Sequence, residues 1–197
     1  LCRCGWKPIL PKEDYRFLVG NGADCLMRRM LSHTAGAYTE EDVLRLRSVY
    51  DDLYGADPMR EVKEYPGLFT VLRTLKQQGI RLAVLSNKPD RDACAVVSHL
   101  FPENFFACCY GQREEIPRKP APDGALLIAK ELGIAPQNCL YIGDSGVDME
   151  TGRAAGMRTV GVLWGFRDKE ELMEHGANAL AKAPEDLLLL AGMEKPQ

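Results

Sequence analysis

Residues 140–149, with the sequence LYIGDSGVDM, decide the fold expected for this chain. An apolar run over residues 139–142 predicts a buried strand, which Gly143 ends. Asp144 follows the strand directly, and Asp148 falls in the first turn of a helix predicted over residues 145–155. Two carboxylates at the carboxyl end of a parallel strand are hard oxygen ligands, which Mg2+ takes together with substrate phosphate. A simpler interpretation stays open here: an aspartate at a helix N-cap, followed by a solvated helical residue.

Length, composition and charge exclude several classes of protein. The chain has 197 residues, of which 46% are hydrophobic and 27% charged, as in ordinary globular proteins. A formal net charge of −3 does not indicate a nucleic-acid surface. The apolar runs are too short to span a bilayer, and the first residues contain no apolar signal-peptide core. We therefore expect a cytoplasmic protein with no nucleic-acid or membrane partner; oligomeric state is not readable from the sequence.

The cysteines indicate free thiols rather than a metal site. The chain has seven cysteines and three histidines. The cysteines form no C-x-x-C pair, and the histidines do not fall at zinc-finger spacing from them. We expect reduced cysteines and no structural zinc.

The pattern of predicted elements changes near residue 63. Residues 1–62 are predicted to be wholly helical, and Thr39 begins a capping-type sequence before one of the helices. From residue 65 onward strands and helices alternate, which is typical of a parallel sheet covered by helices. We expect a helical domain over residues 1–62 and an α/β domain over residues 63–197. Helices of the first domain are predicted over residues 12–19, 22–31 and 40–54. Strands of the second are predicted over residues 80–85, 105–110, 139–142, 159–162 and 179–181. Its helices are predicted over residues 68–78, 91–100, 124–132, 145–155, 169–175 and 184–191.

Polar side chains follow three of the predicted strands. Ser86 and Asn87 follow one, Lys119 lies in the loop after the next, and Asp144 and Asp148 follow the third. Ligands of parallel sheets bind beyond the carboxyl ends of the strands. A hydroxyl, an ammonium and two carboxylates suit Mg2+-assisted phosphoryl transfer, because the cations neutralise the transferring group. Singly, Ser86 could be a helix N-cap and Lys119 a solvated loop charge.

These segments resemble the motifs of the haloacid dehalogenase-like (HAD) phosphohydrolases, and most closely those of phosphoglycolate phosphatases and their relatives. LSNK at residues 85–88 is similar to the second motif of the family. KPAPD at residues 119–123 is similar to the third, and GDSGVD at residues 143–148 to the fourth. The resemblance covers residues 65–190, and the helical start resembles the family's cap domain. It implies a Rossmann-like parallel sheet core with a helical cap.

The resemblance also implies a role for each matching residue. Ser86 and Asn87 would bind phosphate, and Lys119 would steady the nucleophile and the phosphate, so that Ser86 and Lys119 act in catalysis. Asp144 and Asp148 would hold Mg2+. The implied activity is hydrolysis of a small phosphorylated metabolite through an aspartyl-phosphate. The particular phosphomonoester is left open.

Gly20, Asn21 and Gly22 form a glycine-rich entry to a predicted helix of the cap. Backbone N–H groups at such an entry can bind an anion, so these residues are candidates for substrate contact. A simple turn between two helices is the alternative.

One element of the family pattern is missing. The family's nucleophile lies in an Asp-x-Asp-Gly-Thr motif after the first strand, and this chain contains no such motif. The chain also begins with Leu rather than Met. We therefore expect a processed or clipped form that lacks the first, central strand, and we expect the 197-residue chain by itself to be inactive.

Two alternatives remain. The chain could be a non-catalytic HAD-like protein that binds phosphate through Ser86 and Lys119 without turnover. The segment GDSG at residues 143–146 is also similar to the nucleophile segment of chymotrypsin-like proteases. Those proteases are antiparallel barrels with a partner histidine upstream, so a predicted parallel strand disfavours this alternative.

Overall fold

The computed structural model describes residues 1–7, 10–19, 22–34 and 37–193. The chain divides into two compact units, Leu1–Glu61 and Val62–Gln197. No helix in the described ranges is long and apolar enough to cross a membrane.

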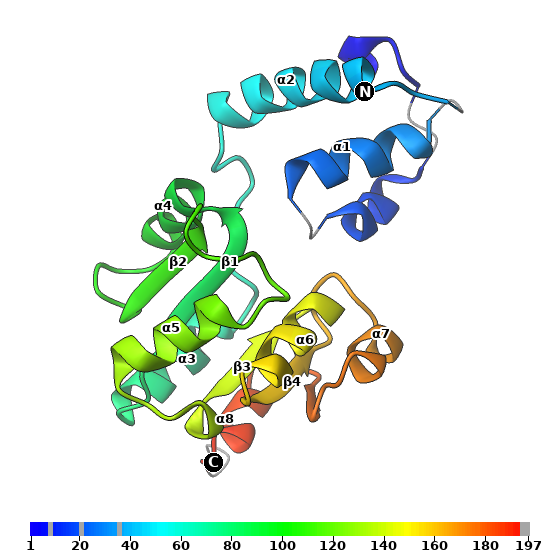
Figure 1. Ribbon diagram of the computed structural model, residues 1–197. Helices are drawn as coiled ribbons and strands as arrows, with labels where there is room; N and C mark the ends of the chain where they lie inside the picture. The colour runs from blue at the N-terminus through cyan, green and yellow to red at the C-terminus, as the bar shows by residue number, and fades with distance from the viewer. Residues whose placement is uncertain (8–9, 20–21, 35–36, 194–197) are drawn as a thin grey trace. The chain divides into compact units, whose positions relative to one another are not determined.

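The N-terminal unit consists of helices (Figure 1). Its longest helix begins at a capping box, because the Thr39 hydroxyl accepts a hydrogen bond from Asp42 N and the Asp42 carboxylate accepts one from Thr39 N. Residues 12–18 form a 3-10 helix rather than the predicted α-helix. Buried Met27 and Leu31 pack with Val43 and Leu46 between the two α-helices. The helices of this unit are η1 (Cys2–Cys4), η2 (Lys12–Leu18), α1 (Ala23–Ser32) and α2 (Glu40–Ala56).

The C-terminal unit alternates strands and helices, and all its strand pairs are parallel. The predicted α/β fold class is therefore confirmed. The strands are β1 (Ala83–Pro89), β2 (Cys108–Gln112), β3 (Leu140–Gly143), β4 (Arg158–Val162) and β5 (Ala179–Ala181). The helices are α3 (Leu68–Gln77), α4 (Asp90–Leu100), α5 (Asp123–Leu132), η3 (Pro136–Asn138), α6 (Gly146–Ala154), α7 (Lys169–Glu174) and α8 (Asp186–Leu190).

These strands form two sheets rather than one. β1 pairs with β2 (Figure 1), and in the other sheet β4 lies between β3 and β5. Helices cover both faces of the three-stranded sheet: α3 and α8 pack around the fully buried Val160, while Met149 of α6 and Leu172 of α7 are fully buried in a separate cluster. Between β1 and β3 the described strands show no pairing.

The first two strands begin later than predicted. β1 starts at Ala83 and extends to Pro89, where it still pairs with Gln112, but its register shifts between Leu85 and Pro89. β2 starts at Cys108. Phe105 and Phe106, at the start of the second predicted strand, instead pack against aromatic rings of α3 and of Phe101, the residue that follows α4. This aromatic cluster comprises Phe69, Phe101, Phe105 and Phe106. Apolar runs predicted the strands, but ring packing decided where the pairing begins.

Candidate functional site

Asp148 is a buried carboxylate held at the start of α6. Ser145 is the N-cap of this helix, its hydroxyl accepting from Asp148 N and donating to Asp148 Oδ2 at 2.6 Å. Asp148 is only 7% exposed. A Cβ atom on Gly143 would lie 2.2 Å from Asp148 Cβ, so only glycine at this position lets the carboxylate approach the end of β3. The simpler interpretation, with Asp144 as N-cap and a solvated Asp148, is therefore wrong.

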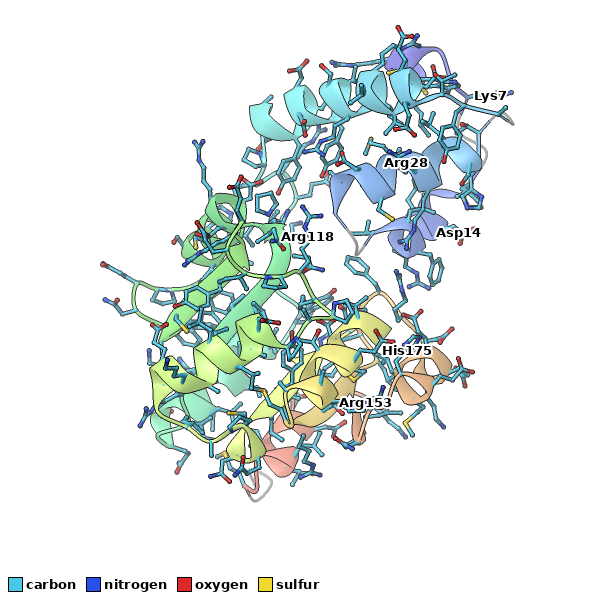
Figure 2. All side chains as sticks on the ribbon, in the orientation of Figure 1. Lys7, Asp14, Arg28, Arg118, Arg153 and His175 are labelled. Atoms are coloured by element: carbon cyan, nitrogen blue, oxygen red, sulfur yellow. The ribbon has the colours of Figure 1, made fainter. Side chains whose placement is uncertain are left out.

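Lys119 links β1 of the two-stranded sheet to α6, the helix that follows β3. It lies in the loop between β2 and α5, and its Nζ donates to Asp148 Oδ1 at 2.7 Å. The same Nζ lies 3.4 Å from the carbonyl oxygen of Leu85 in β1. Both partners of the ion pair are largely buried, with side chains 14% and 9% exposed. The structure thus brings Lys119 and Asp148 together, and Lys119 is not a solvated loop charge. The neighbouring Arg118, labelled in Figure 2, is exposed instead.

Asn87 fixes the backbone from which Lys119 extends. Its Oδ1 accepts from Lys119 N at 2.9 Å, and its Nδ2 donates to the Lys119 carbonyl at 3.1 Å. Ser86 Oγ accepts from Lys88 N at 3.1 Å. Ser86 is not a helix N-cap, because the N-cap of α4 is Pro89 and no side chain caps this helix. A hydroxyl that accepts one bond keeps its hydrogen for a ligand, and one hydrogen of the Asn87 amide is unused by the contact with Lys119.

Asp144 is contacted by the loop after β4. Its Oδ2 accepts a hydrogen bond from Phe166 N at 3.0 Å. Burial raises the pKa of Asp144, and the nearby Asp148 charge adds to this, while the Phe166 N–H and the Lys119 ammonium act in the opposite direction. Asp144 and Asp148 are also linked directly, since Asp144 N lies 3.3 Å from Asp148 Oδ2.

The glycine-rich helix entry is only partly described. Gly20 and Asn21 lie outside the described residues. Gly22 is the N-cap of α1 and has a φ of 85°, a left-handed value that favours glycine. The structure therefore does not test these three candidates for substrate contact.

Three residues that contact the site, Gly165, Phe166 and Glu171, were not among the predicted site residues. Gly165 and Phe166 belong to an aromatic loop after β4, and the position of this loop beyond a strand's carboxyl end was its only signal. Glu171, on α7, accepts from Gly146 N at 3.1 Å, and no local pattern indicated this contact.

The donor set at this site fits Mg2+. In the described part of the chain no group of three or more histidine, cysteine, aspartate or glutamate side chains could hold a metal. Asp144 and Asp148 supply two carboxylates whose charges interact, and Asp144 N lies 3.3 Å from Asp148 Oδ2. Mg2+ in proteins is often held by only one or two carboxylates, with water and substrate phosphate as the remaining ligands. The two aspartates could hold such an ion.

The strand-end residues, the parallel sheets and the comparison with protein families agree on one class. The chain belongs to the haloacid dehalogenase-like hydrolases, whose family model matches residues 3–156. It is 32% identical over 180 residues to a phosphoglycolate phosphatase of Pseudomonas putida, covering 90% of this chain and 63% of that protein. It is 30% identical over 203 residues to the phosphoglycolate phosphatase of Escherichia coli strain K12, covering 94% and 81%. The chain thus spans between about two thirds and four fifths of these relatives.

Solved structures give the same fold. A candidate phosphoglycolate phosphatase from Lactobacillus delbrueckii subsp. bulgaricus superposes with a TM-score of 0.86 at 31% identity, covering 92% of this chain and 83% of that one. A haloacid dehalogenase-like family protein from Streptococcus pneumoniae superposes with a TM-score of 0.79, covering 93% and 82%. At 19% identity the second likeness concerns the fold alone.

Proposed function

We propose that the intact protein is a Mg2+-dependent phosphomonoester hydrolase that acts on a small phosphorylated metabolite, with 2-phosphoglycolate as the first candidate. One observation carries this proposal: the Lys119 ammonium reaches both Asp148 and the Leu85 carbonyl within β1, so the three motif-bearing segments converge on one place. Similarity to phosphoglycolate phosphatases supports the choice of substrate class.

Each of the five site residues has a definite task in this proposal. The Ser86 hydroxyl and the remaining Asn87 N–H donate to phosphate oxygens. Lys119, which pairs with Asp148, would offset negative charge as the phosphoryl group transfers. Asp144 and Asp148 hold the ion, and bound Mg2+ would supply further positive charge to the phosphate oxygens.

We propose that the nucleophile lies on a further strand, outside this chain, that pairs between β1 and β3. The absence of pairing between these two strands in the described structure supports such an insertion. The first aspartate of that strand would attack phosphorus while the ester P–O bond breaks. A second aspartate would give a proton to the leaving alkoxide and then take one from the water that hydrolyses the aspartyl-phosphate. The N-terminal unit, residues 1–61, would serve as the cap domain.

Phosphate release by the full-length protein tests the proposal. With Mg2+ present, we expect release from 2-phosphoglycolate or another small phosphomonoester, and none from the 197-residue chain alone. Lys119→Met should lower kcat/KM by about 100- to 1,000-fold, because it removes a preorganised cation from the transferring group. Lys130→Met is the matched control, since Lys130 is exposed on α5 and should be neutral.

The same assay separates the non-catalytic alternative. Phosphate release that Asp144→Asn abolishes would exclude a protein that only binds phosphate. Saturable phosphate binding without release from any small phosphomonoester would instead overturn the proposed hydrolase.

A further inference from the structure

The loop and helix after β4 contact the Asp144 carboxylate and the first residue of the helix that carries Asp148, although neither belongs to the other sequence motifs of the site. The segment over residues 164–171 contains the Phe166 N–H that donates to Asp144 and the Glu171 carboxylate that accepts from Gly146 N. Gly146 is the first residue of α6, the helix that carries Asp148. One segment therefore reaches both aspartates, directly or through their helix.

Gly165 gives the closer of the two contacts. A Cβ atom built on Gly165 would lie 2.2 Å from Asp144 Cβ and 2.5 Å from Asp144 Oδ2. No side chain fits at that distance without displacing Asp144 or the loop. The adjoining Phe166 N–H is aimed at the same oxygen, at 3.0 Å. Gly165 and Phe166 together thus restrict both the position and the rotation of the Asp144 carboxylate.

Glu171 gives the second contact, and it is itself held in place. Its Oε1 accepts from Gly146 N at 3.1 Å, while its Oε2 pairs with Arg167 Nε at 3.2 Å. Asp168 caps α7 by accepting from Glu171 N at 2.9 Å. A carboxylate at a helix N-terminus satisfies an N–H group that has no partner within the helix. Glu171 therefore fixes the start of α6.

The packing of α7 against α6 supports this restraint. A Cβ atom on Gly146 would lie 2.5 Å from the His175 ring, which follows α7 (Figure 2). His175 Nδ1 and Glu150 Oε1, on α6, lie 2.7 Å apart. The buried Met149 and Leu172 side chains close the interface between the two helices. α7 is thus packed against α6 at several points.

We propose that residues 164–171 form a positioning element that sets the separation and orientation of the Asp144 and Asp148 carboxylates for metal binding. The inference rests on the proposed function, because it assigns these residues to the same divalent-cation site. Gly165 and Glu171 are positioning residues: they act on the ion through the two aspartates. Partners that orient metal ligands typically contribute 10- to 100-fold to metal affinity.

Mg2+ titration of the full-length protein by calorimetry, without substrate, tests the positioning element. Gly165→Ala should raise the Kd for Mg2+ by about 10- to 100-fold. Gly55→Ala is the matched control: Gly55 lies in helix α2, and a Cβ there would meet no atom within 4 Å. It should leave the Kd unchanged.

A second pair of variants covers the case in which Gly165→Ala fails to fold. Glu171→Ala removes the acceptor for Gly146 N without introducing a steric clash, and should raise the Kd by up to about 10-fold. Glu170→Ala, at the exposed preceding position, makes the same change in charge and should have little effect. The apparent Mg2+ requirement of kcat should shift in parallel with Kd, which a mere loss of folded protein would not produce.

The outcomes separate this inference from the proposed function. A parent protein that hydrolyses phosphomonoesters and binds Mg2+, with folded Gly165→Ala or Glu171→Ala variants of unchanged Kd, would overturn only the positioning role. A parent that binds Mg2+ with Kd values shifted as expected, yet releases no phosphate, would support the positioning role and overturn the hydrolase. A parent that binds no Mg2+ would overturn the positioning role.

Discussion

The two sheets of the C-terminal unit hold their functional side chains by different means. The β3–β4 pairing keeps one register along its length, and glycines next to it let Asp144 and Asp148 pack closely. β1 shifts register against β2 after Leu85, and its residues are half-buried up to the exposed Pro89. The carboxylates that follow β3 are held by an ion pair, by hydrogen bonds from side chains and backbone N–H groups, and by steric contacts with glycines. On the two-stranded sheet, the Asn87 side chain instead forms two hydrogen bonds with the backbone of Lys119 in the neighbouring loop.

This difference has a physical consequence for stability. Buried ionised groups depend strongly on their partners, because an unpaired buried charge is costly. Hydrogen bonds between an amide and a backbone contribute less each, and their loss exposes groups that water can partly satisfy. Removing a carboxylate that follows β3 should therefore lower the free energy of unfolding more than removing the Asn87 amide in β1.

The largest expected effect is that of Asp148→Ala. This change leaves the Lys119 ammonium without its carboxylate in a largely buried place and removes the acceptor for the Ser145 hydroxyl. We expect the free energy of unfolding to fall by about 3 kcal/mol. Urea unfolding in the absence of divalent metal measures it.

Asp51→Ala is the control for this variant, because Asp51 forms an exposed i,i+4 pair with Arg47. Its cost should stay below about 1 kcal/mol. Equal losses from the two substitutions would contradict the distinction between a buried and an exposed pair.

Asn87→Ala should have an intermediate effect. It removes both hydrogen bonds to the backbone of Lys119, on the two-stranded side of the site. We expect a loss of about 1–2 kcal/mol in the same unfolding experiment. Asn138→Ala, at an exposed position in η3, should change stability by less than about 0.5 kcal/mol. A loss from Asn87→Ala as large as that from Asp148→Ala would remove the contrast between the sheets.

The smallest expected effects are changes in how the free energy of unfolding depends on pH. They should have opposite signs for Asp90, which follows β1, and Asp144, which follows β3. After β1, the Arg113 guanidinium and then the Gly111 N–H lower the pKa of Asp90. After β3, burial raises the pKa of Asp144. An aspartate with a lowered folded pKa stabilises the fold above its unfolded pKa of about 3.9, and this is lost as pH falls. An aspartate with a raised folded pKa lowers the free energy of unfolding when it is ionised. This loss disappears as the pH falls through the folded pKa and the carboxyl is protonated.

Asp90→Asn should therefore lower the free energy of unfolding at pH 7, and Asp144→Asn should raise it, when divalent metal is removed. Both differences should shrink as the pH is lowered through the aspartate range. Urea unfolding at a series of pH values gives the comparison, with Asp52→Asn at an exposed position of α2 as control. Changes of the same sign at neutral pH would show that the two aspartates do not differ in environment.

Local patterns predicted the elements well where the chain has strong punctuation. Gly133 and Ser145 are examples: Gly133 ends α5 in a left-handed conformation, and the Ser145 hydroxyl caps α6. β5 coincides with its predicted residues. The first two strands were placed too early, because an apolar run specifies burial but not which residues pair. The start of β2 depended instead on aromatic rings contributed by other segments of the chain.

The residue types at the site, their order along the chain and the placement of Asp144 and Asp148 after a strand were determined by the sequence itself, whereas Ser86 and Asn87 lie inside β1 rather than after it. Turn residues and hydrophobic periodicity carry that information locally. Only the tertiary structure decided that Lys119 pairs with Asp148, that Asn87 holds the Lys119 backbone, and that Gly165 approaches Asp144. These contacts join residues about 20 to 30 positions apart, and their distances depend on how strands and helices pack, which no local pattern encodes.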